Sequence, residues 1–438
     1  MIRRRVLKAV SLSRSFSKEL AEAATDAPST SSTSGSRPYL NFTESVLQKF
    51  PKQLAALEAA VKQAEEKRKS ALDPQKREDL LKLFTETVVS PKCRMIPVGS
   101  SVSGLATTNS DIDLAVFPVD METRKRFAWD FYGNSSFKQM FMNTMGSLIV
   151  QAMEKKGFQL LKKEIIPETR VPLIRLDFSQ STSIDIQFPF NGLVNYQSFR
   201  NSLLIKEYVH ADERFPQLYL WLRTVLEALE TKDSQHFLLS SYHCLLLTIH
   251  FLQSEQCLTP WPVLPVLCKT NPELVGPNVP IEKVIEEISS KKASVAWQSK
   301  NKMPLSELIV RFVEYYASNF DPVNTAIYID RGLTQKRKQR SHEAARLLLF
   351  DPYNNATVCR SQYAMKAFSQ TLYFLRKKMK NGMMIESFPS FEEENSLFRE
   401  ETKWAAWRTQ REMALKEEHK KIERLQERVE ERYIAEIK

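Results

Sequence analysis

Hydrophobic positions along the chain follow two periods, and the places where the period changes divide the chain into parts. Helical spacing runs through residues 42–69 and 75–89. Between 94 and 190, short β-rich runs alternate with one helical run at 137–156, and helical spacing returns after 201. This order predicts an α+β fold, in which a small mixed-sheet domain is followed by a mainly helical domain.

The predicted strands are the β-rich runs MIPV, DIDLAV, PLIRLDF and SIDIQF. In DIDLAV, Ile112, Leu114 and Val116 occupy alternate positions, so they should enter the core from one face of the strand. The polar run SQSTS can turn PLIRLDF back along SIDIQF as a hairpin. We therefore expect a small sheet of mixed strand direction.

Changes of composition set the expected domain boundaries. Residues 24–37 (ATDAPSTSSTSGSR) are rich in Ser and Thr and cannot build a core. The last stretch is a charged helix with a sparse apolar stripe, suited to pack on the body of the protein, to bind a protein partner or to grip RNA. The expected parts are a disordered leader at 1–38, a helical segment at 39–90 that packs with the helical domain, the sheet domain at 91–200, the helical domain at 201–390 and the charged helix at 391–438.

The first eighteen residues, MIRRRVLKAVSLSRSFSK, contain six basic residues and no acidic residue. Ile2, Val6 and Val10 fall at helical spacing, and no long apolar core follows the arginines. This composition is typical of a mitochondrial transit peptide and not of a secretory signal. A basic tail of a cytoplasmic protein and a nuclear signal at Arg3–Arg5 are the other interpretations.

Composition narrows the class of protein further. The formal net charge of +11 is compatible with binding to nucleic acid. The five cysteines contain no CxxC pair, which argues against a disulfide framework and a structural zinc site. The longest apolar run, Cys244–Leu252, is too short to span a bilayer, so no membrane segment is expected. His243 and His250 lie seven residues apart on a predicted helix, where we expect them to pack or to cap.

Asp111 and Asp113 are the first candidates for chemistry. Because successive side chains of a strand point to opposite faces, both carboxylates lie on the same face of DIDLAV. Two carboxylates that close repel each other unless a cation lies between them, and their oxygen atoms suit Mg²⁺. A solvated strand end is the simpler interpretation of a DxD sequence taken alone.

The residues that precede this pair favour a functional interpretation. Gly99 and Ser100 follow the MIPV run, and the sequence SVSGLA can start a helix whose free N–H groups face an anion. Backbone suited to phosphate therefore lies about ten residues before the carboxylate pair. The P-loop sequence GxxxxGK[ST] is absent.

The segment GSSVSGLATTNSDIDL resembles the signature of the DNA-polymerase-β-like nucleotidyltransferases, and in detail that of the noncanonical poly(A) polymerases and terminal uridylyltransferases. The resemblance covers residues 45–375. It implies a nucleotidyltransferase sheet domain and a helical central domain that contains a poly(A)-polymerase-associated region. The family has a third carboxylate on a neighbouring strand, for which Asp185 in SIDIQF is the candidate and Asp177 in LIRLDF the rival.

Further likenesses to the family occur after the third carboxylate. RNSLL resembles a family segment whose Asn contacts the ribose, which implies Asn201, with Ser202 beside it near the phosphates. LSSYHCLLLTIHFLQ resembles the family's Ser-Tyr helix. This likeness implies that Ser241 approaches the phosphates and that Tyr242 stacks on the base.

The resemblance implies two-metal phosphoryl transfer with Mg²⁺ or Mn²⁺. Asp111 and Asp113 would hold both ions, and Asp185 the ion that activates the 3′-hydroxyl of a single-stranded RNA. That hydroxyl attacks the α-phosphate of a nucleoside triphosphate, and pyrophosphate leaves. Positioning and charge neutralisation supply nearly all the catalysis, so no nucleophilic side chain is required.

Two departures from the family's pattern leave alternatives open. Relatives carry two lysines one turn apart that grip the triphosphate, whereas QLYLWLRTVLEALE offers Arg223, and Lys206 is another cation that could reach in. The stretch DPYNNATVCR lacks the histidine that uridylyltransferases tend to have there, which favours ATP over UTP. A catalytically idle RNA-binding or scaffold subunit is the third interpretation.

Overall fold

The computed structural model describes residues 41–384 except for short gaps, which are residues 73, 88–91, 109, 169–170, 180–181, 189–195, 235–237, 255–257, 259, 291, 293, 338–346, 354–356 and 360–361. The predicted leader and the predicted charged helix at 391–438 lie outside the described residues. In the described part of the chain, no helix is both long enough and apolar enough to cross a membrane.

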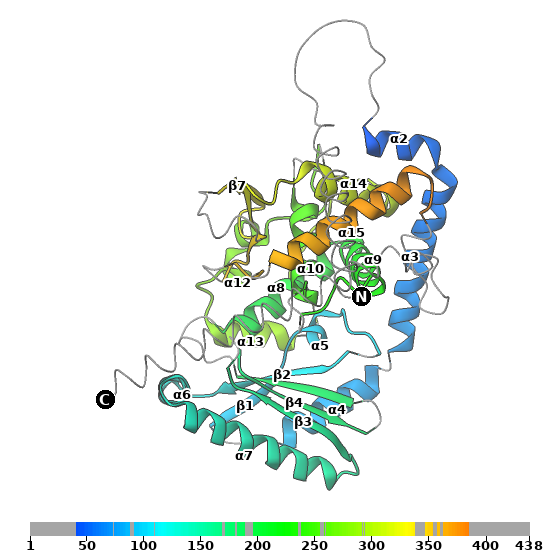
Figure 1. Ribbon diagram of the computed structural model, residues 1–438. Coiled ribbons are helices and arrows are strands. Elements are labelled where there is room, and N and C mark those ends of the chain that lie inside the picture. The colour runs from blue at the N-terminus through cyan, green and yellow to red at the C-terminus, as the bar shows by residue number, and fades with distance from the viewer. Residues whose placement is uncertain are drawn as a thin grey trace, which may run out of the picture. The chain divides into compact units, whose positions relative to one another are not determined.

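An α/β domain contains a five-stranded sheet with the strand order β1-β2-β5-β4-β3 (Figure 1). Strand β2 pairs with β5 in parallel, whereas β1 with β2, β3 with β4, and β4 with β5 are antiparallel. The sheet is therefore small and mixed, as predicted, and β4 and β5 form the predicted hairpin. The strands are β1 (Cys93–Pro97), β2 (Ile112–Pro118), β3 (Leu160–Ile166), β4 (Leu173–Phe178) and β5 (Thr182–Gln187).

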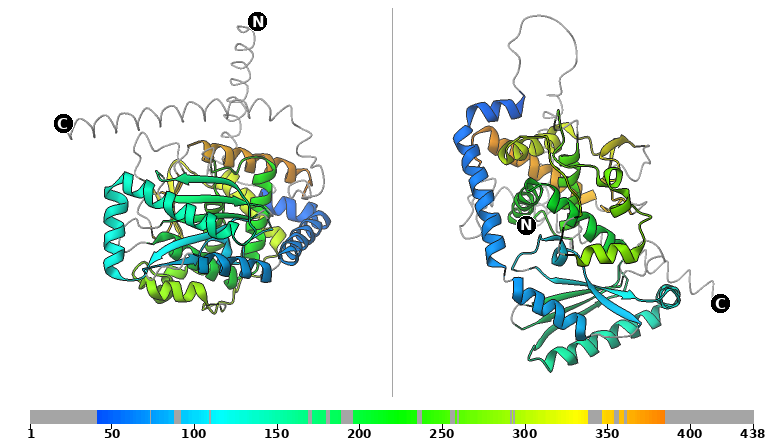
Figure 2. Two further views of the ribbon diagram at one scale, coloured as in Figure 1. Left: turned by 90° about the horizontal axis from the view of Figure 1, so that it is seen from below. Right: turned by 180° about the vertical axis from the view of Figure 1, so that it is seen from behind.

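Helices α4, α6 and α7 pack with one face of this sheet (Figures 1 and 2). Phe84, Met142 and Ile149 from these helices are buried with Leu114 and Ile184 from the strands in one apolar core. Removing such side chains from water is the main favourable contribution to the folding of this layer. The helices are α4 (Pro74–Thr87), α6 (Met121–Gly133) and α7 (Ser135–Glu154).

The opposite face of the sheet contributes to the core of the helical domain. Ala115 and Phe117, on the face of β2 opposite to Leu114, are buried in a second core with Phe199, Leu203 and many other helical residues. The alternation within DIDLAV thus places one set of side chains in each core. The helices of this domain are α2 (Phe42–Lys49), α3 (Pro51–Ala71), α8 (Gln197–Ala211), α9 (Arg214–Ala228), α10 (Ser241–Gln253), α11 (Leu267–Thr270), α12 (Pro272–Val275), α13 (Ile281–Ser289), α14 (Leu305–Glu314), the π-helix η1 (Tyr315–Asn319) and α15 (Gln362–Lys380).

Some elements differ from the expectation. Helices α2 and α3 contact α14, whereas α4, from the same predicted segment, contacts β1 and α7 in the α/β domain. Helix α6 and strand β3 were not predicted. In β3 the charged run Lys162–Glu164 hides the alternation of apolar positions. A second sheet, β7-β6-β8, was also missed because its strands are only three or four residues long; they are β6 (Thr325–Tyr328), β7 (Leu333–Lys336) and β8 (Leu348–Phe350).

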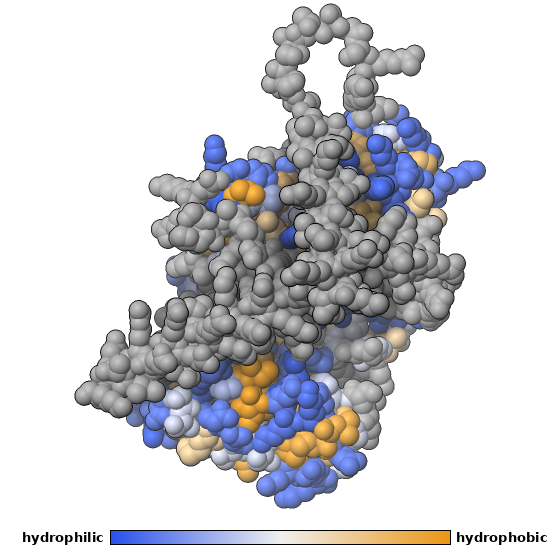
Figure 3. All heavy atoms as spheres, viewed as in Figure 1, coloured by the Kyte–Doolittle hydropathy of each residue, from blue (hydrophilic) through white to orange (hydrophobic). Residues whose placement is uncertain are grey.

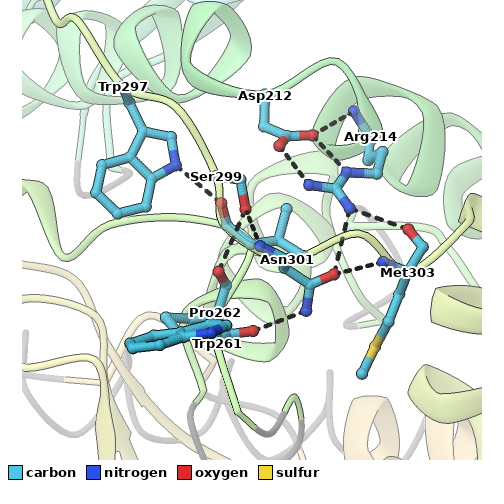
Figure 4. A network of polar contacts seen from close by, with 9 residues as sticks. Asp212, Arg214, Trp261, Pro262, Trp297, Ser299, Asn301 and Met303 are labelled. Carbon is cyan, nitrogen blue, oxygen red and sulfur yellow. Dashed lines mark hydrogen bonds and ion pairs between the residues drawn. The ribbon is translucent and has the colours of Figure 1, made fainter.

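A network of polar contacts fixes the chain before α14 to the start of α9 (Figure 4). Arg214 donates from Nε and Nη2 to the two carboxylate oxygens of Asp212, at 2.8 and 2.7 Å. Its Nη1 donates to the carbonyl oxygen of Met303 at 2.9 Å, and Asn301 Nδ2 donates to the carbonyl oxygen of Trp261 at 2.7 Å. Since these groups are hydrogen-bonded to one another, their burial is compensated.

Large apolar side chains also reach the surface of the α/β domain. Trp129 is 81% exposed, Met140 60%, Leu148 59% and Leu161 66%. Figure 3 shows apolar surface interspersed with polar side chains over this domain. Scattered apolar side chains of this kind are normal on a folded protein and do not by themselves define a binding surface.

The two histidines of α10 have the structural roles that the sequence predicted. His243 accepts a hydrogen bond at Nδ1 from the Ser240 backbone N–H, and Ser240 Oγ accepts one from the His243 N–H, which together form the cap of the helix. His250 is buried and lies 2.8 Å from the Tyr316 hydroxyl, which itself donates to the carbonyl oxygen of Leu247. Burial lowers the pKa of His250 to about 3.

We predict that His250 makes the free energy of unfolding fall as pH decreases from 6.5. The pKa of this histidine is lower in the folded protein than in the unfolded chain, so only the unfolded chain binds the proton in this window. The loss should be about 1.4 kcal/mol per pH unit. In His250→Gln, urea unfolding between pH 6.5 and 5 should show a correspondingly smaller slope. His210→Gln, at an exposed position of α8, is the control, and equal slopes for all three proteins would contradict the prediction.

Candidate active site

The two carboxylates of DIDL lie at the start of strand β2. Asp111 immediately precedes the strand and Asp113 is its second residue. Ile112 and Leu114, between and after them, are 3% and 0% exposed in the core of the α/β domain. The alternation of side chains therefore directs both carboxylates to the face of the sheet that adjoins the helical domain.

Asp185 lies directly opposite Asp113 on the neighbouring strand. The parallel pairing of β2 with β5 sets Asp113 against Asp185, and adjacent strands are separated by about 4.8 Å. Asp177, the rival candidate, lies one strand further away on β4, where it faces Ser183 and accepts a hydrogen bond from its hydroxyl at 2.7 Å. The strand register thus places Asp185, and not Asp177, next to the DIDL carboxylates.

Gly99 allows the turn before α5 (Ser100–Ser103) to approach Asp113 closely. Its φ is +62°, a conformation that residues with a side chain rarely adopt. A Cβ atom on this residue would lie only 2.7 Å from Asp113 Oδ2. The Gly99 N–H donates to Ser202 Oγ at 2.8 Å, and the Asp113 N–H to Ser101 Oγ at 3.3 Å. The glycine turn, strand β2 and helix α8 are therefore fixed to one another around Asp113.

Ser202 and Gln187 hold the glycine turn and Asp113 in place through hydrogen bonds. The Ser202 hydroxyl accepts from Gly99 and donates to the carbonyl oxygen of Ser198, so it holds the turn in place. Gln187 donates from Nε2 to Asp113 Oδ1 at 3.4 Å and accepts from the Ser198 hydroxyl at 2.7 Å. Gln187 was not predicted, although its place two residues after Asp185 on the same strand face is readable from the sequence.

Arg175 is the most important site residue that the sequence interpretation missed. It lies opposite Asp185 on β4, and its Nε and Nη2 donate to Oδ1 and Oδ2 of Asp185 at 2.9 and 2.7 Å. This hydrogen bonding raises the pKa of Arg175, and the charges of Asp185, Asp111 and Glu164 act in the same direction. A permanently charged guanidinium is therefore bound to Asp185, next to the DIDL carboxylates.

Four of the residues predicted to contact the nucleotide lie on helices α8 and α10, namely Asn201, Ser202, Ser241 and Tyr242. Asn201 Oδ1 is buried and has no hydrogen-bond partner among the described residues. Tyr242 donates to Oδ2 of Asp351, which is buried, at 3.3 Å. Ser241 begins α10 and hydrogen-bonds to Tyr219 of α9, where burial is the main cause that raises the tyrosine's pKa to about 12. Ser100 is the first residue of the one-turn helix α5.

Arg223 belongs to a cluster of three charges that is continuous with Ser241. It hydrogen-bonds to Tyr219, and its Nε donates to Glu227 Oε1 at 2.8 Å. Lys232 Nζ donates to the same oxygen at 2.9 Å. Burial opposes ionisation of Glu227, but the two cations prevail and hold its pKa below the ordinary value. Lys232 was not predicted, because it follows the helix and lies outside the expected one-turn spacing.

Lys206, the other predicted candidate to contact a triphosphate, is instead hydrogen-bonded within the protein. Its Nζ donates to the backbone carbonyl oxygens of Glu287 and Ser290 at 2.7 and 2.6 Å. The side chain is 3% exposed, and burial lowers its pKa. Lys206 therefore fastens the end of α13 to α8.

The carboxylates suit a divalent cation by donor type and by position. Asp113 and Asp185 supply oxygen atoms from directly opposed positions, and the absence of a side chain on Gly99 leaves space beside Asp113 Oδ2. Among the described residues, no three His, Cys, Asp or Glu side chains are grouped as a ready metal site. Asp185 is instead engaged by Arg175. The donor set fits Mg²⁺ or Mn²⁺, with Asp111, Asp113 and Asp185 as the residues that would hold it.

A separate cavity lies where α3, the start of α9 and the chain before α14 meet. Its lining includes Glu58, Lys62, Asp212, Arg214 and Gln217, and none of the candidate site residues. Lys62 pairs with Glu58 and Arg214 with Asp212. Because these charges are already paired within the protein, the carboxylate face of the sheet remains the candidate active site.

Comparisons with known proteins agree on the kind of fold. A family model described as "Poly(A) RNA polymerase, mitochondrial-like, central palm domain" matches residues 50–210. Poly(A) RNA polymerase GLD2 of Bos taurus is 26% identical, and that of Homo sapiens 27%, over 235 residues, which is 53% of this chain. The alignment covers 44% of each of these relatives, so the chain matches less than half of their length.

Solved structures show the same fold at low sequence identity. The GLD-2/RNP-8 complex has a chain with a TM-score of 0.57 and 22% identity, covering 76% of this chain and 98% of that chain. A structure of mtPAP in complex with UTP has a TM-score of 0.55 and 16% identity, covering 83% and 76%. A cytoplasmic RNA terminal U-transferase has a TM-score of 0.51 and 19% identity, covering 77% and 96%.

The chain has the fold of these solved structures, and its opposed carboxylates lie on one face of the sheet. The sequence likenesses are to a narrower group of proteins. They are to poly(A) RNA polymerases, over residues 50–210 for the family model and over 53% of the chain for the GLD2 relatives.

We predict that Gly99→Ala destabilises the protein by about 1–3 kcal/mol, because the substitution strains a backbone with φ of +62° and crowds Asp113. Urea unfolding measures the change. Gly133→Ala is the matched control, since a Cβ on Gly133 meets nothing within 4 Å. Its free energy of unfolding should stay within about 0.5 kcal/mol of the unsubstituted protein. Equal stability of the two variants would contradict the proposed role of Gly99.

Proposed function

We propose that this protein is a template-independent RNA 3′-end nucleotidyltransferase that adds adenylate from ATP. The observation that carries the proposal is the direct opposition of Asp113 and Asp185 on parallel strands, with the Gly99 turn packed against Asp113. An RNA 3′-hydroxyl would attack the α-phosphate of ATP. The new phosphodiester bond forms as the bond to pyrophosphate breaks, and the hydroxyl proton passes to solvent or to a carboxylate.

The site residues have distinct roles in this reaction. Asp111, Asp113 and Asp185 would hold Mg²⁺, which when bound supplies neutralisation of phosphate charge and orients the reacting oxygen atoms. Asn201 Oδ1, buried and without a partner among the described residues, is available to accept a hydrogen bond from a ribose hydroxyl. Tyr242 would stack on the base, while Gly99, Ser100, Ser202 and Ser241 shape the phosphate side.

Two observations support ATP as the nucleotide. The curated relatives with 26–27% identity carry the name poly(A) RNA polymerase. The sequence DPYNNATVCR lacks the histidine typical of uridylyltransferases, although its residues 354–356 lie outside the described part of the chain. UTP is the second candidate nucleotide, with the same residues in the same roles.

One observation favours a second function, that of a catalytically idle RNA-binding or scaffold subunit. Glu227 pairs with both Arg223 and Lys232, and so lowers the positive charge of the cluster that reaches Ser241 through Tyr219. A carboxylate at this position opposes the approach of a triphosphate. The intact set of three aspartates supports the enzyme, and extension activity separates the two functions.

Single-stranded RNA would bind through basic and aromatic surface. Helix α15 ends with Lys377, Lys378 and Lys380, which suit contacts with phosphates. Two similar solved structures are complexes with RNP-8 and GLD-3, which motivates a protein partner for this chain as well. Residues 391–438, predicted from the sequence as a charged helix and outside the described residues, are the proposed contact for it. Mitochondrial targeting by the leader also stays a prediction, which a fluorescent reporter fused to residues 1–35 can test.

We predict that the purified full chain extends a labelled single-stranded RNA with ATP and Mg²⁺. Asp111→Ala/Asp113→Ala should reduce the rate to below about one-hundredth, because the charge on the transferred phosphate is no longer compensated. Asp177→Asn, on the adjacent strand, is the control that should retain most of the rate. Extension with UTP alone would establish the second nucleotide. RNA binding without extension by any nucleotide would establish the idle subunit.

We predict that Lys232 and Glu227 act in opposite directions on the KM for the nucleotide. Lys232→Ala removes a cation beside Arg223 and should raise KM about three- to tenfold, and Glu227→Gln should lower it by a similar factor, with kcat little changed. Lys283→Ala is the control, since Lys283 is an exposed lysine of α13 whose Nζ donates to a backbone carbonyl. Extension rates at varied ATP measure both constants. Unchanged KM in both variants would show that the triphosphate binds elsewhere.

A further inference from the structure

Charged side chains form a continuous row across four strands of the sheet, on the face of the candidate active site. Asp113 of β2 is paired with Asp185 of β5, Asp185 with Arg175 of β4, and Arg175 with Glu164 of β3. The row therefore carries one cation between acidic groups on either side. Arg175 and Asp185 are only 22% and 11% exposed at their side chains, so water screens their interaction weakly.

The guanidinium of Arg175 uses both oxygen atoms of Asp185. The contacts of 2.9 and 2.7 Å form the two-pronged geometry that is the strongest arrangement of an arginine with a carboxylate. Without it, Asp185 would face Asp113 across one strand spacing as an uncompensated like charge. Arg175 thus supplies the neutralisation that a divalent cation would otherwise provide.

A second acceptor for Arg175 lies on its other side. Arg175 Nη1 is 4.0 Å from Glu164 Oε2, while Glu164 Oε1 contacts Lys162 at 2.7 Å. A small rotation of the guanidinium could exchange Asp185 for Glu164 without leaving the arginine unpaired. The row therefore contains both an occupied partner and an alternative partner for the same cation.

We propose that Arg175 is the resident counter-ion of Asp185, which holds this carboxylate while no divalent cation is bound and releases at least one of its oxygen atoms toward Glu164 when a cation binds. The proposal rests on the proposed function in that Asp185 is one of the metal-holding residues. It makes Arg175 a positioning residue that competes with the metal ion. Metal affinity is then set in part by the breaking of an ion pair inside the protein.

Titration of the full chain with Mn²⁺, followed by the electron paramagnetic resonance signal of the free ion without nucleotide, tests the proposal. Arg175→Met should bind Mn²⁺ at least about tenfold more tightly, since it removes the competing positive charge. Arg175→Lys keeps the charge but loses the two-pronged contact, so its affinity should lie between those of the unsubstituted protein and Arg175→Met. Glu164→Gln removes the alternative partner and should weaken Mn²⁺ binding about two- to threefold.

Thermal unfolding provides a second measurement that does not depend on catalysis. In Arg175→Met, the difference in Tm between Mg²⁺ and EDTA should exceed that of the unsubstituted protein, because the aspartates repel each other in EDTA.

Arg94→Met is the matched control. It removes a charge from the same sheet at an exposed position opposite Phe117, and its Mn²⁺ affinity should stay within about twofold.

The possible results separate this proposal from the proposed function. Unchanged or weaker Mn²⁺ binding in both Arg175 variants would overturn the counter-ion role, even if the unsubstituted protein extends RNA. Should Arg175→Met fail to fold, Arg175→Lys and Glu164→Gln still decide the outcome by the opposite directions of their shifts. Absence of Mn²⁺ binding in every protein would also overturn the counter-ion role. The proposed nucleotidyltransferase activity is tested separately, by the RNA extension assay.

Discussion

The parallel pairing of β2 with β5 is the constraint on which the rest of the candidate site depends. It places Asp113 and Asp185 at directly opposed positions, although 72 residues separate them in the chain. Like charges at one strand spacing are unfavourable unless the protein or a ligand compensates them. The neighbouring strand compensates the charge of Asp185 through Arg175, while Gly99 leaves space beside Asp113 and Ser202 holds the glycine turn in place.

Strand β2 places its core residues on one face of the sheet and its carboxylates on the other. Ile112 and Leu114 belong to the core of the α/β domain, while Asp111 and Asp113 alternate with them on the other face. A shift of one residue in the strand register would bury both carboxylates and expose the apolar residues. Fold and site are therefore specified by the same alternation, and neither can change alone.

Much of the α/β domain could be predicted because its strands alternate clearly between apolar and polar residues. Asp185 could be selected over Asp177 from the family resemblance, and the register places it opposite Asp113. Arg175 could have been found by counting outward from the SQSTS turn, since the hairpin pairs it with Asp185. Lys232 could not, because its contact with Glu227 depends on how the chain turns after α9. Tertiary contacts of that kind leave no periodic signal.

The hydrogen bond from the Gly99 N–H to Ser202 Oγ joins the α/β domain to the helical domain at the carboxylates themselves. Ser202 is anchored in turn to the carbonyl oxygen of Ser198, one turn earlier in α8. A motion that separates the two domains must either break this bond or pivot around it. A pivot at this bond would place the axis of any such motion beside Asp113, so that the spacing of the carboxylates stays constant while more distant parts of the two domains move apart.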